Sequence, residues 1–141
     1  MDTLFNFANL TVLPFWIIMI ALPRWSWAVR VIRSPLIALP PALIYAAIVL
    51  PLIAQGGLEF SSFGSLAGVM GLLTSPQGAA AGWAHFLAFD LFVGRWVYLD
   101  ALEPRIHPAL LALPLFFVFM LGPIGFLLYL AARWLARRST R

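Results

Sequence analysis

Long apolar stretches, separated by short polar or glycine-rich breaks, make up most of this chain. A membrane-spanning helix needs about 20 mostly apolar residues, and four stretches approach or exceed that length. They cover residues 4–22, 35–54, 76–103 and 108–135. Prolines inside the first, second and fourth stretches predict kinks, which spanning helices tolerate. The pattern therefore predicts four spanning helices in a single membrane domain over residues 1–141.

Residues 60–74 form a moderately apolar segment that is rich in Gly and Ser and short for a span. Ser75 and Pro76 then suit the N-cap and first position of the next helix. If residues 60–74 cross the membrane, seven arginines share one side; if they do not, four lie on each side. The distribution of the arginines thus favours five spans, whereas the length of residues 60–74 favours four. We expect an all-α integral membrane protein, a four-helix bundle with a short re-entrant or interfacial segment between spans two and three.

Composition supports a membrane protein. Hydrophobic residues make up 63% of the chain and charged residues 10%, against about 45–50% and 25% in soluble domains. Mean hydropathy is +0.97. Too few polar residues remain to cover a soluble fold, which excludes a cytosolic enzyme, an intrinsically disordered chain and a conventional nucleic-acid binder. The net charge of +4 comes from arginines that flank apolar stretches, a pattern typical of membrane anchoring.

Seven ionisable residues crowd into positions 85–107. An ionised side chain at the centre of a bilayer costs about 2.5–3.5 kcal/mol on insertion scales. Asp90 falls near the middle of its predicted span, so it indicates either a functional group or an ion pair with Arg95 or with an arginine of another helix. The seven residues are His85, Asp90, Arg95, Asp100, Glu103, Arg105 and His107.

The polar residues of the third span point in several directions. At about 100° per residue, His85 and Glu103 share a direction, Asp90 lies roughly 140° away, and Arg95 lies roughly 80° to the opposite side. They cannot occupy one face of a regular α-helix. Either the other spans surround this helix or a π-bulge rotates part of the set. Both alternatives place residues 76–103 at the centre of the bundle.

Asp100 and Glu103 stand one turn apart, and two close carboxylates favour one protonated and one ionised group, an acid and a base. Alternatively, they mark an exposed helix end. His85 and His107 suit bases or metal ligands, although single histidines are more often structural. The Glu-x-x-His spacing of helix-bundle metal sites is absent, and the chain has no cysteine. We expect no metal and no cofactor.

The third span carries the pattern W-x-H-x4-D-L-F-x2-R-x-V-Y-x-D-x-L-E from Trp83 to Glu103. This pattern resembles the signature of the plant abscisic-acid-deficient-four family, plastid membrane proteins required for neoxanthin synthesis that have many bacterial relatives. Residues 12–16 and 122–125 extend the resemblance. The plant proteins carry charges where this chain has residues 60–74, which favours four spans over five.

The resemblance implies a carotenoid-linked membrane protein of a bacterial inner or photosynthetic membrane. In plants the reaction converts the 5,6-epoxide of violaxanthin to the allene of neoxanthin. This isomerisation needs an acid to open the epoxide and a base to remove a vinylic proton, but no redox cofactor. The resemblance implies Asp90, Asp100 or Glu103 as the acid, and His85 or another of these carboxylates as the base. It also implies substrate-binding side chains, which are Trp83, Arg95, Trp96 and Tyr98.

Other functions stay open at this stage. One alternative is a non-catalytic subunit that binds pigment or braces a photosynthetic or carotenogenic complex. A proton-coupled transporter would also use intramembrane Asp and His, but four spans without an inverted repeat argue against it. The expected partners are the lipid bilayer and a carotenoid or other long isoprenoid, with a homo-oligomer or a larger membrane complex left open. We expect no nucleic-acid partner.

Overall fold

The computed structural model describes residues 1–102 and 106–139, and these residues form helices and connecting turns without a β-strand. The prediction of an all-α protein is confirmed. The elements in chain order are α1 (Asp2–Ala21), α2 (Ser26–Arg33), η1 (Pro35–Ala38), α3 (Leu39–Ala54), η2 (Phe60–Gly64), α4 (Leu66–Thr74), α5 (Pro76–Asp100), α6 (Pro108–Leu121) and α7 (Pro123–Ser139).

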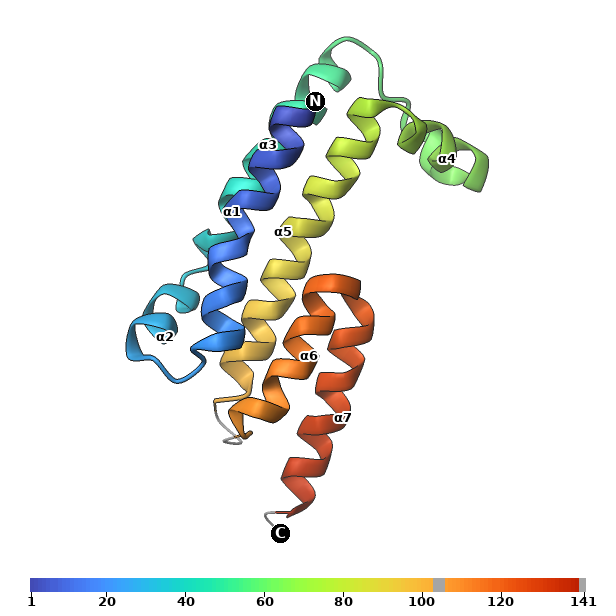
Figure 1. The fold of residues 1–141 in the computed structure, drawn as a ribbon. Helices are drawn as coiled ribbons and strands as arrows, with labels where there is room; N and C mark the ends of the chain where they lie inside the picture. Colours follow the sequence, from blue (N-terminus) through green and yellow to red (C-terminus); the bar gives the residue numbers. More distant parts are fainter. Residues whose placement is uncertain (103–105, 140–141) are drawn as a thin grey trace.

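Three long helices, α1, α3 and α5, run side by side along the molecule (Figure 1). Helix α5 contacts α1, α3 and α4, and it contacts α6 over part of its length; it also touches α2 and α7 (Figure 1). Helix α5 therefore lies among the other helices as predicted, but one face of it is uncovered. Helix α5 ends at Asp100, before the predicted end at residue 103, and Glu103 lies outside the described residues.

Local capping sets where α4 and α5 begin. Ser75 Oγ accepts a hydrogen bond of 2.9 Å from the Gly78 amide, and Pro76 occupies the first turn of α5. Ser65 Oγ likewise accepts from Gly68 at 3.1 Å and starts α4. The nine residues of α4 reach only about 13.5 Å, which is too short to cross a bilayer. Helix α4 stands aside from the three long helices (Figure 1).

The fourth predicted span is wrong as a continuous helix. The chain reverses after α6 and returns as α7, so the two helices form an antiparallel hairpin (Figure 1). Gly122 at the turn has φ +42°, a region that side chains other than glycine rarely adopt. Pro123 follows without an N–H and cannot continue α6. Gly125 lets the helices touch, because a Cβ there would lie 2.0 Å from the Val118 nitrogen.

The core lies where α1, α5 and α6 meet. Trp16 of α1 is 2% exposed and rests against Gly94 of α5, where a Cβ would stand 2.4 Å from the indole Cη2. The Trp16 ring also lies 5.3 Å from the Phe119 ring of α6, measured between centroids. A glycine at position 94 thus lets the largest side chain of the core fit between the helices.

Among the described residues, two helical segments are long and apolar enough to cross a membrane: α1, and η1 with α3 taken together over Pro35–Ala54. Only 22% of each apolar window is buried inside the structure, whereas an apolar core helix of a soluble protein is mostly buried. Helix α6 is apolar but shorter, and α5 carries Asp90, Arg95 and Asp100 and does not meet the same criterion. Four spanning helices are therefore not confirmed.

Candidate functional site

One face of α5 has no helix packed against it. His85 is exposed there, as are Phe86, Phe89 and Phe92, at 56%, 59% and 47% of their surface. We call these four residues the open face of α5. The prediction that other spans surround this helix on every side is therefore wrong, because α6 and α7 meet part-way along α5 and leave the region beyond their turn uncovered (Figure 1).

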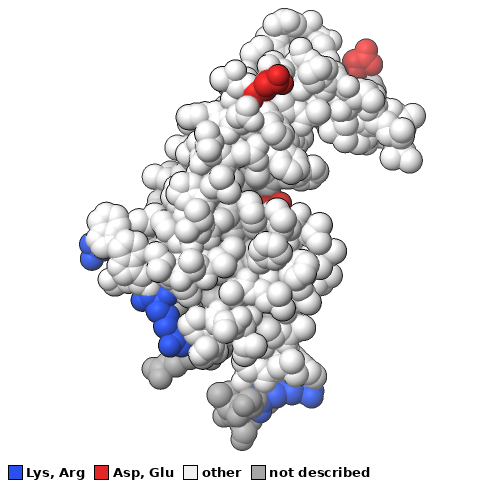
Figure 2. Space-filling model, viewed as in Figure 1, with Lys and Arg blue, Asp and Glu red and all other residues white. Residues whose placement is uncertain are grey.

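Asp90 lies at the edge of the open face, against the turn between α6 and α7. Its carboxylate is so close to Gly122 that a Cβ on that glycine would stand 2.5 Å from Asp90 Oδ1. The side chain is half-buried, and it makes no hydrogen bond or ion pair with the residues that the structure describes. Figure 2 shows a small acidic patch between the two ends of the molecule. Asp90 is therefore a carboxylate held in place by packing.

The amino end of α7 begins beside this carboxylate. Helix α7 starts at Pro123, directly after the glycine that contacts Asp90. The first turn of a helix carries amide N–H groups without intrahelical acceptors and the positive end of the helix dipole. The α6–α7 hairpin therefore brings favourable electrostatic potential to Asp90 without a charged partner.

His85 lies toward the other side of the open face, near α3. Its ring centroid is 4.6 Å from that of Phe89 and 5.6 Å from that of Tyr45 on α3. His85 also lines a cavity of about 440 Å³ that is bounded by α3, α4 and α5. His85 and Asp90 thus flank the open face from different directions, about 7.5 Å apart along the helix axis.

Asp100 is engaged in an ion pair with α7. Arg133 Nη2 donates to Asp100 Oδ1 at 2.8 Å, and Arg133 Nε lies 2.6 Å from Oδ2. The Tyr129 hydroxyl donates to the same Oδ2. These contacts fasten the end of α5 to α7 and occupy both carboxylate oxygens. The ion pair that the sequence left open between Asp90 and Arg95 is not formed among the described residues.

Arg95 forms a hydrogen bond with the backbone of α2, which connects α1 to η1 and α3. Its Nη2 donates to the carbonyl of Arg33, the last residue of α2. Carbonyls at a helix carboxyl end lack intrahelical donors, so a guanidinium is a suitable cap. Arg95 Nε is buried without a hydrogen-bond partner among the described residues. Arg95 therefore anchors α2 against α5.

The three aromatic residues expected to bind substrate have structural contacts. Trp83 Nε1 donates to Asn9 Oδ1 of α1 at 3.0 Å. Tyr98 is fully buried, and its hydroxyl donates to the Pro23 carbonyl at 2.7 Å. The Trp96 ring packs against α7 and lies 5.8 Å from the Tyr129 ring. Among them, Trp83 and Trp96 keep 42% and 39% of their surface exposed.

Sequence reasoning missed three residues that the structure brings to this region. Gly122 contacts the Asp90 carboxylate, and Tyr129 and Arg133 bind Asp100. The Gly-Pro dipeptide at 122–123 is a known helix-breaking signal, which could have indicated the turn. No local pattern pairs residue 100 with residue 133. No group of three or more His, Cys, Asp or Glu within the described ranges is placed to hold a metal ion.

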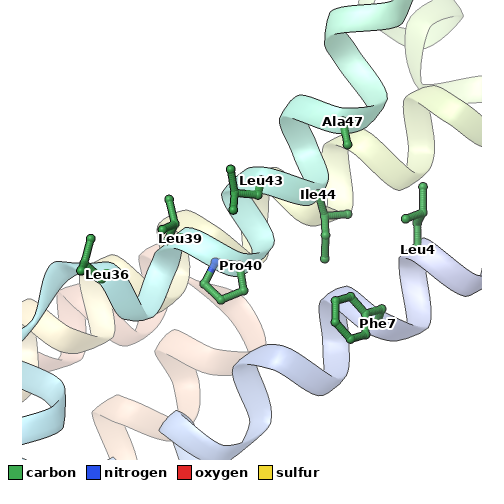
Figure 3. Close-up of a pocket in the computed structure, with 8 residues that line it drawn as sticks. All are labelled: Leu4, Phe7, Leu36, Leu39, Pro40, Leu43, Ile44 and Ala47. Atoms are coloured by element: carbon green, nitrogen blue, oxygen red, sulfur yellow. The ribbon is translucent and has the colours of Figure 1, made fainter.

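A second hollow lies between α1 and α3 and has a volume of about 380 Å³. Figure 3 shows its lining, which is entirely apolar. With no titratable group and no hydrogen-bonding side chain, this hollow offers no acid–base chemistry. Its lining residues are Leu4, Phe7, Leu36, Leu39, Pro40, Leu43, Ile44 and Ala47.

A family model described as ABA4-like, or ABA DEFICIENT 4-like, matches residues 3–129. The chain belongs to this family. The matched region includes Asp90 and the Gly122 turn but ends before Arg133. The chain is also 29% identical over 111 residues to Protein ABA DEFICIENT 4, chloroplastic, of Arabidopsis thaliana. That similarity covers 75% of this chain and 50% of the plant protein, so the match spans about half of its relative's length. No solved structure matches the chain.

Proposed function

We propose that this ABA4-like chain is an integral membrane protein that isomerises an epoxidised carotenoid end group, with Asp90 as the acid–base group. The observation that carries the proposal is a half-buried carboxylate without a partner among the described residues, held against a helix turn beside an open aromatic face. Membership of the family supports the pathway, since it includes the plant ABA DEFICIENT 4 protein. A bacterial inner or photosynthetic membrane is the proposed location.

Membrane insertion is supported by the surface. Large apolar side chains are exposed on both helical segments long enough to cross, among them Leu10 at 63%, Ile17 at 60% and Leu50 at 63%. Apart from the tyrosines Tyr98 and Tyr129, no residue with a polar or charged side chain is buried within the described residues. This distribution suits a chain surrounded by lipid, because exposed apolar surface of this extent is costly in water. We propose that α1, η1 with α3, and α5 cross the bilayer, and that the α6–α7 hairpin enters it part-way. The four-span bundle expected from the sequence becomes three crossings and this hairpin.

The reaction transfers one proton to oxygen and removes one proton from carbon, so neither the number of protons nor the number of electrons changes overall. One epoxide C–O bond breaks and its oxygen takes a proton, while a vinylic C–H proton leaves and its electron pair completes the allene. One carboxyl group can serve both steps, because it gives one proton to the oxygen and receives another from carbon. Asp90 has both oxygens free of hydrogen bonds within the described part of the chain. Asp100 has both oxygens engaged by Arg133 and Tyr129, so we assign Asp100 to structure.

The depth of Asp90 suits a carotenoid end group. Asp90 lies about 7.5 Å along α5 from Arg95, which bonds to the arginine-bearing helix α2. A hydroxylated carotenoid ring stays near the headgroups with its hydroxyl in water, and its polyene enters the hydrocarbon. The epoxide then lies just inside the polar boundary. The exposed rings of Phe86 and Phe89 extend farther into the bilayer from Asp90 and offer apolar contact to the polyene.

His85 is proposed to contact the substrate and not to transfer protons. Its ring packs against Phe89 and Tyr45, and it lies about 7.5 Å deeper than Asp90 along the axis, where the polyene would lie. Among the aromatic residues of the third span, Trp83 and Trp96 keep exposed surface for a ligand. The Tyr98 hydroxyl is already bonded to Pro23.

The proposal is tested by producing the protein in a host that accumulates violaxanthin and by chromatography of the pigments. We expect a new isomer with the wild-type protein. Asp90→Asn should lower product formation by about 10²–10⁴-fold, the usual contribution of a general acid–base group, with normal protein levels. Glu59→Gln is the matched control, since Glu59 is exposed at the far end of the molecule, and it should leave product formation unchanged.

Two outcomes would overturn the catalytic proposal. Full product formation by Asp90→Asn would exclude this carboxylate as the acid–base group. Absence of a new isomer, with unchanged carotenoid co-purifying with the protein, would instead support a pigment-binding subunit, for which the open face of α5 would be the contact surface.

A further inference from the structure

The path of the chain brings its arginines to one end of the molecule. Within residues 95–100, about 7.5 Å of α5, the helix contacts two distant segments. Arg95 donates to the carbonyl of Arg33 at the end of α2, and Asp100 binds Arg133 of α7. The end of α2 and residue 133 of α7 therefore both lie near the end of α5, and the last turns of α7 continue beyond it (Figure 1).

Charge is divided between the two ends. Seven of the nine arginines fall in described residues. Figure 2 shows blue only toward one end, while most of the acidic colour lies at the opposite end and a small acidic area lies between them. At that opposite end, Asp2 begins α1 and Glu59 precedes η2, and both are exposed. The described arginines at the other end are Arg24, Arg30, Arg33, Arg95, Arg133, Arg137 and Arg138.

Helix α2 has the form of an interfacial anchor. Ala28 and Ile32 are buried against the long helices, while Arg30 on the same helix is exposed. Trp25 and Trp27 are 52% and 58% exposed, and their rings stack with centroids 6.5 Å apart. Tryptophan and arginine together favour the headgroup layer, because the ring is amphipathic and the guanidinium pairs with phosphate.

The carboxyl end of α7 repeats this chemistry. Trp134 is 53% exposed, and the Arg138 guanidinium carbon lies 3.6 Å from its ring centroid. Two segments that are about a hundred residues apart in the sequence thus present the same pair of side-chain types at one end of the molecule. A fully crossing fourth helix would have placed them on opposite sides of the membrane.

We propose that this arginine end is the surface that binds anionic lipid headgroups of the cytoplasmic leaflet, with the chain's first residue on the opposite side. The α6–α7 hairpin then enters and leaves the bilayer from the cytoplasmic face. Arginine-rich segments next to spans stay in the cytoplasm and are attracted by anionic lipids. The inference rests on the membrane placement proposed above and not on the carotenoid chemistry.

Because the chain has no cysteine, single-cysteine variants report the side of each segment directly. Asp2→Cys, Glu59→Cys, Ser26→Cys and Arg138→Cys are expressed in a bacterial host and treated with a membrane-impermeant maleimide. We expect labelling of positions 2 and 59 in right-side-out vesicles, and of positions 26 and 138 only in inverted vesicles. Labelling of 26 and 138 from opposite sides would overturn the hairpin arrangement. His107→Cys should label with position 26; labelling with position 59 would indicate five crossings and overturn it equally.

The lipid preference is tested with the purified protein in nanodiscs of phosphatidylglycerol or phosphatidylcholine. The wild-type protein should unfold at a higher temperature in phosphatidylglycerol. The triple variant Arg24→Gln, Arg30→Gln and Arg138→Gln should lose most of that difference, while Asp2→Asn with Glu59→Gln should keep it. Equal unfolding temperatures of the wild type in the two lipids would overturn anionic lipid binding. Neither measurement needs a carotenoid, so a failed isomerase assay leaves both outcomes interpretable.

Discussion

The carboxylate of Asp90 lies directly against Gly122, thirty-two positions later in the chain, so that a Cβ on the glycine would come within 2.5 Å of Oδ1. This contact joins the only acidic side chain without a partner on the described part of α5 to the turn that reverses the chain. The contact shows where the Asp90 carboxylate lies in the molecule. No pattern within the third span predicts this position, because Gly122 belongs to a different predicted span.

Gly122→Ala should destabilise the protein for two separable reasons. The backbone has φ +42° and ψ −92°, a conformation that costs a non-glycine residue about 1–3 kcal/mol, and the new methyl group would stand 2.5 Å from Asp90 Oδ1, so the carboxylate would have to move at a further cost. The free energy of unfolding in detergent micelles measures the sum. Gly56→Ala is the control, since Gly56 has φ +68° and a methyl group added there would meet no atom within 4 Å. It should show the cost of an alanine at a positive φ without a steric contact.

The collision is isolated in a double-mutant cycle. In an Asp90→Ala background the contact disappears, so Gly122→Ala should then cost less than it does in the wild-type protein. If the two costs of Gly122→Ala, with and without Asp90, were equal, the carboxylate would not be packed against this turn.

Gly125→Ala should open the α6–α7 hairpin. The added methyl group would lie 2.0 Å from the Val118 nitrogen and 2.6 Å from the Pro114 carbonyl oxygen, and backbone atoms cannot rotate away. We expect a loss of about 3 kcal/mol, at the upper end of overpacking costs. Gly71→Ala in α4 meets no atom within 4 Å and should stabilise its helix by about 0.5–1 kcal/mol. A loss at Gly125 no larger than the change at Gly71 would argue against close packing of the hairpin.

Arg133→Met should weaken the attachment of α7 to α5. The change removes hydrogen bonds to a carboxylate that is 14% exposed, and bonds to charged groups contribute about 1.5–3 kcal/mol. Chemical unfolding in micelles measures the loss. Arg30→Met, at an exposed position of α2, should change stability by less than about 0.5 kcal/mol under the same conditions. A loss at position 133 no larger than that at position 30 would show that the ion pair is not structural.

Tyr98→Phe should reduce stability by about 0.5–1.5 kcal/mol, the net value of one hydrogen bond. The hydroxyl is buried and donates to the Pro23 carbonyl at 2.7 Å, so the phenylalanine keeps the packing and leaves that carbonyl without its donor. Tyr45→Phe serves as the comparison, because the Tyr45 hydroxyl makes no hydrogen bond within the described residues. A shift of the thermal midpoint in the first variant and none in the second is the expected result; equal shifts would contradict it.

Several features of this fold could be predicted because their causes are local in the sequence. The start of α5 follows from Ser75 and Pro76, which supply a cap and a preset backbone angle within four residues. The length of the apolar stretch predicted a helical segment over residues 35–54, and the structure shows the same bounds. The shortness of residues 60–74 favoured a segment that does not span, and α4 within it has only nine residues. The angular spread of its polar side chains placed α5 among the other helices but did not predict that one face of it is uncovered (Figure 1).

The reversal at Gly122 was not decided by the sequence. A Gly-Pro pair inside an apolar run is compatible with a kinked span and with a turn. The choice depends on whether α6 can pack against α7, which requires the bare surface of Gly125 beside Val118. That contact exists only after the chain has folded back.

The sequence by itself determined that this chain is helical, apolar on its outside and charged along one central helix, because length, composition and capping act within a few residues. Only the tertiary structure decided that Asp100 pairs with Arg133, that Asp90 has no partner among the described residues, and that distant arginines gather at one end. The physical reason is that a charged group is stabilised by the residues that folding brings within a few ångströms of it. The turn at Gly122 reverses the chain and so determines which residues of α7 lie near α5.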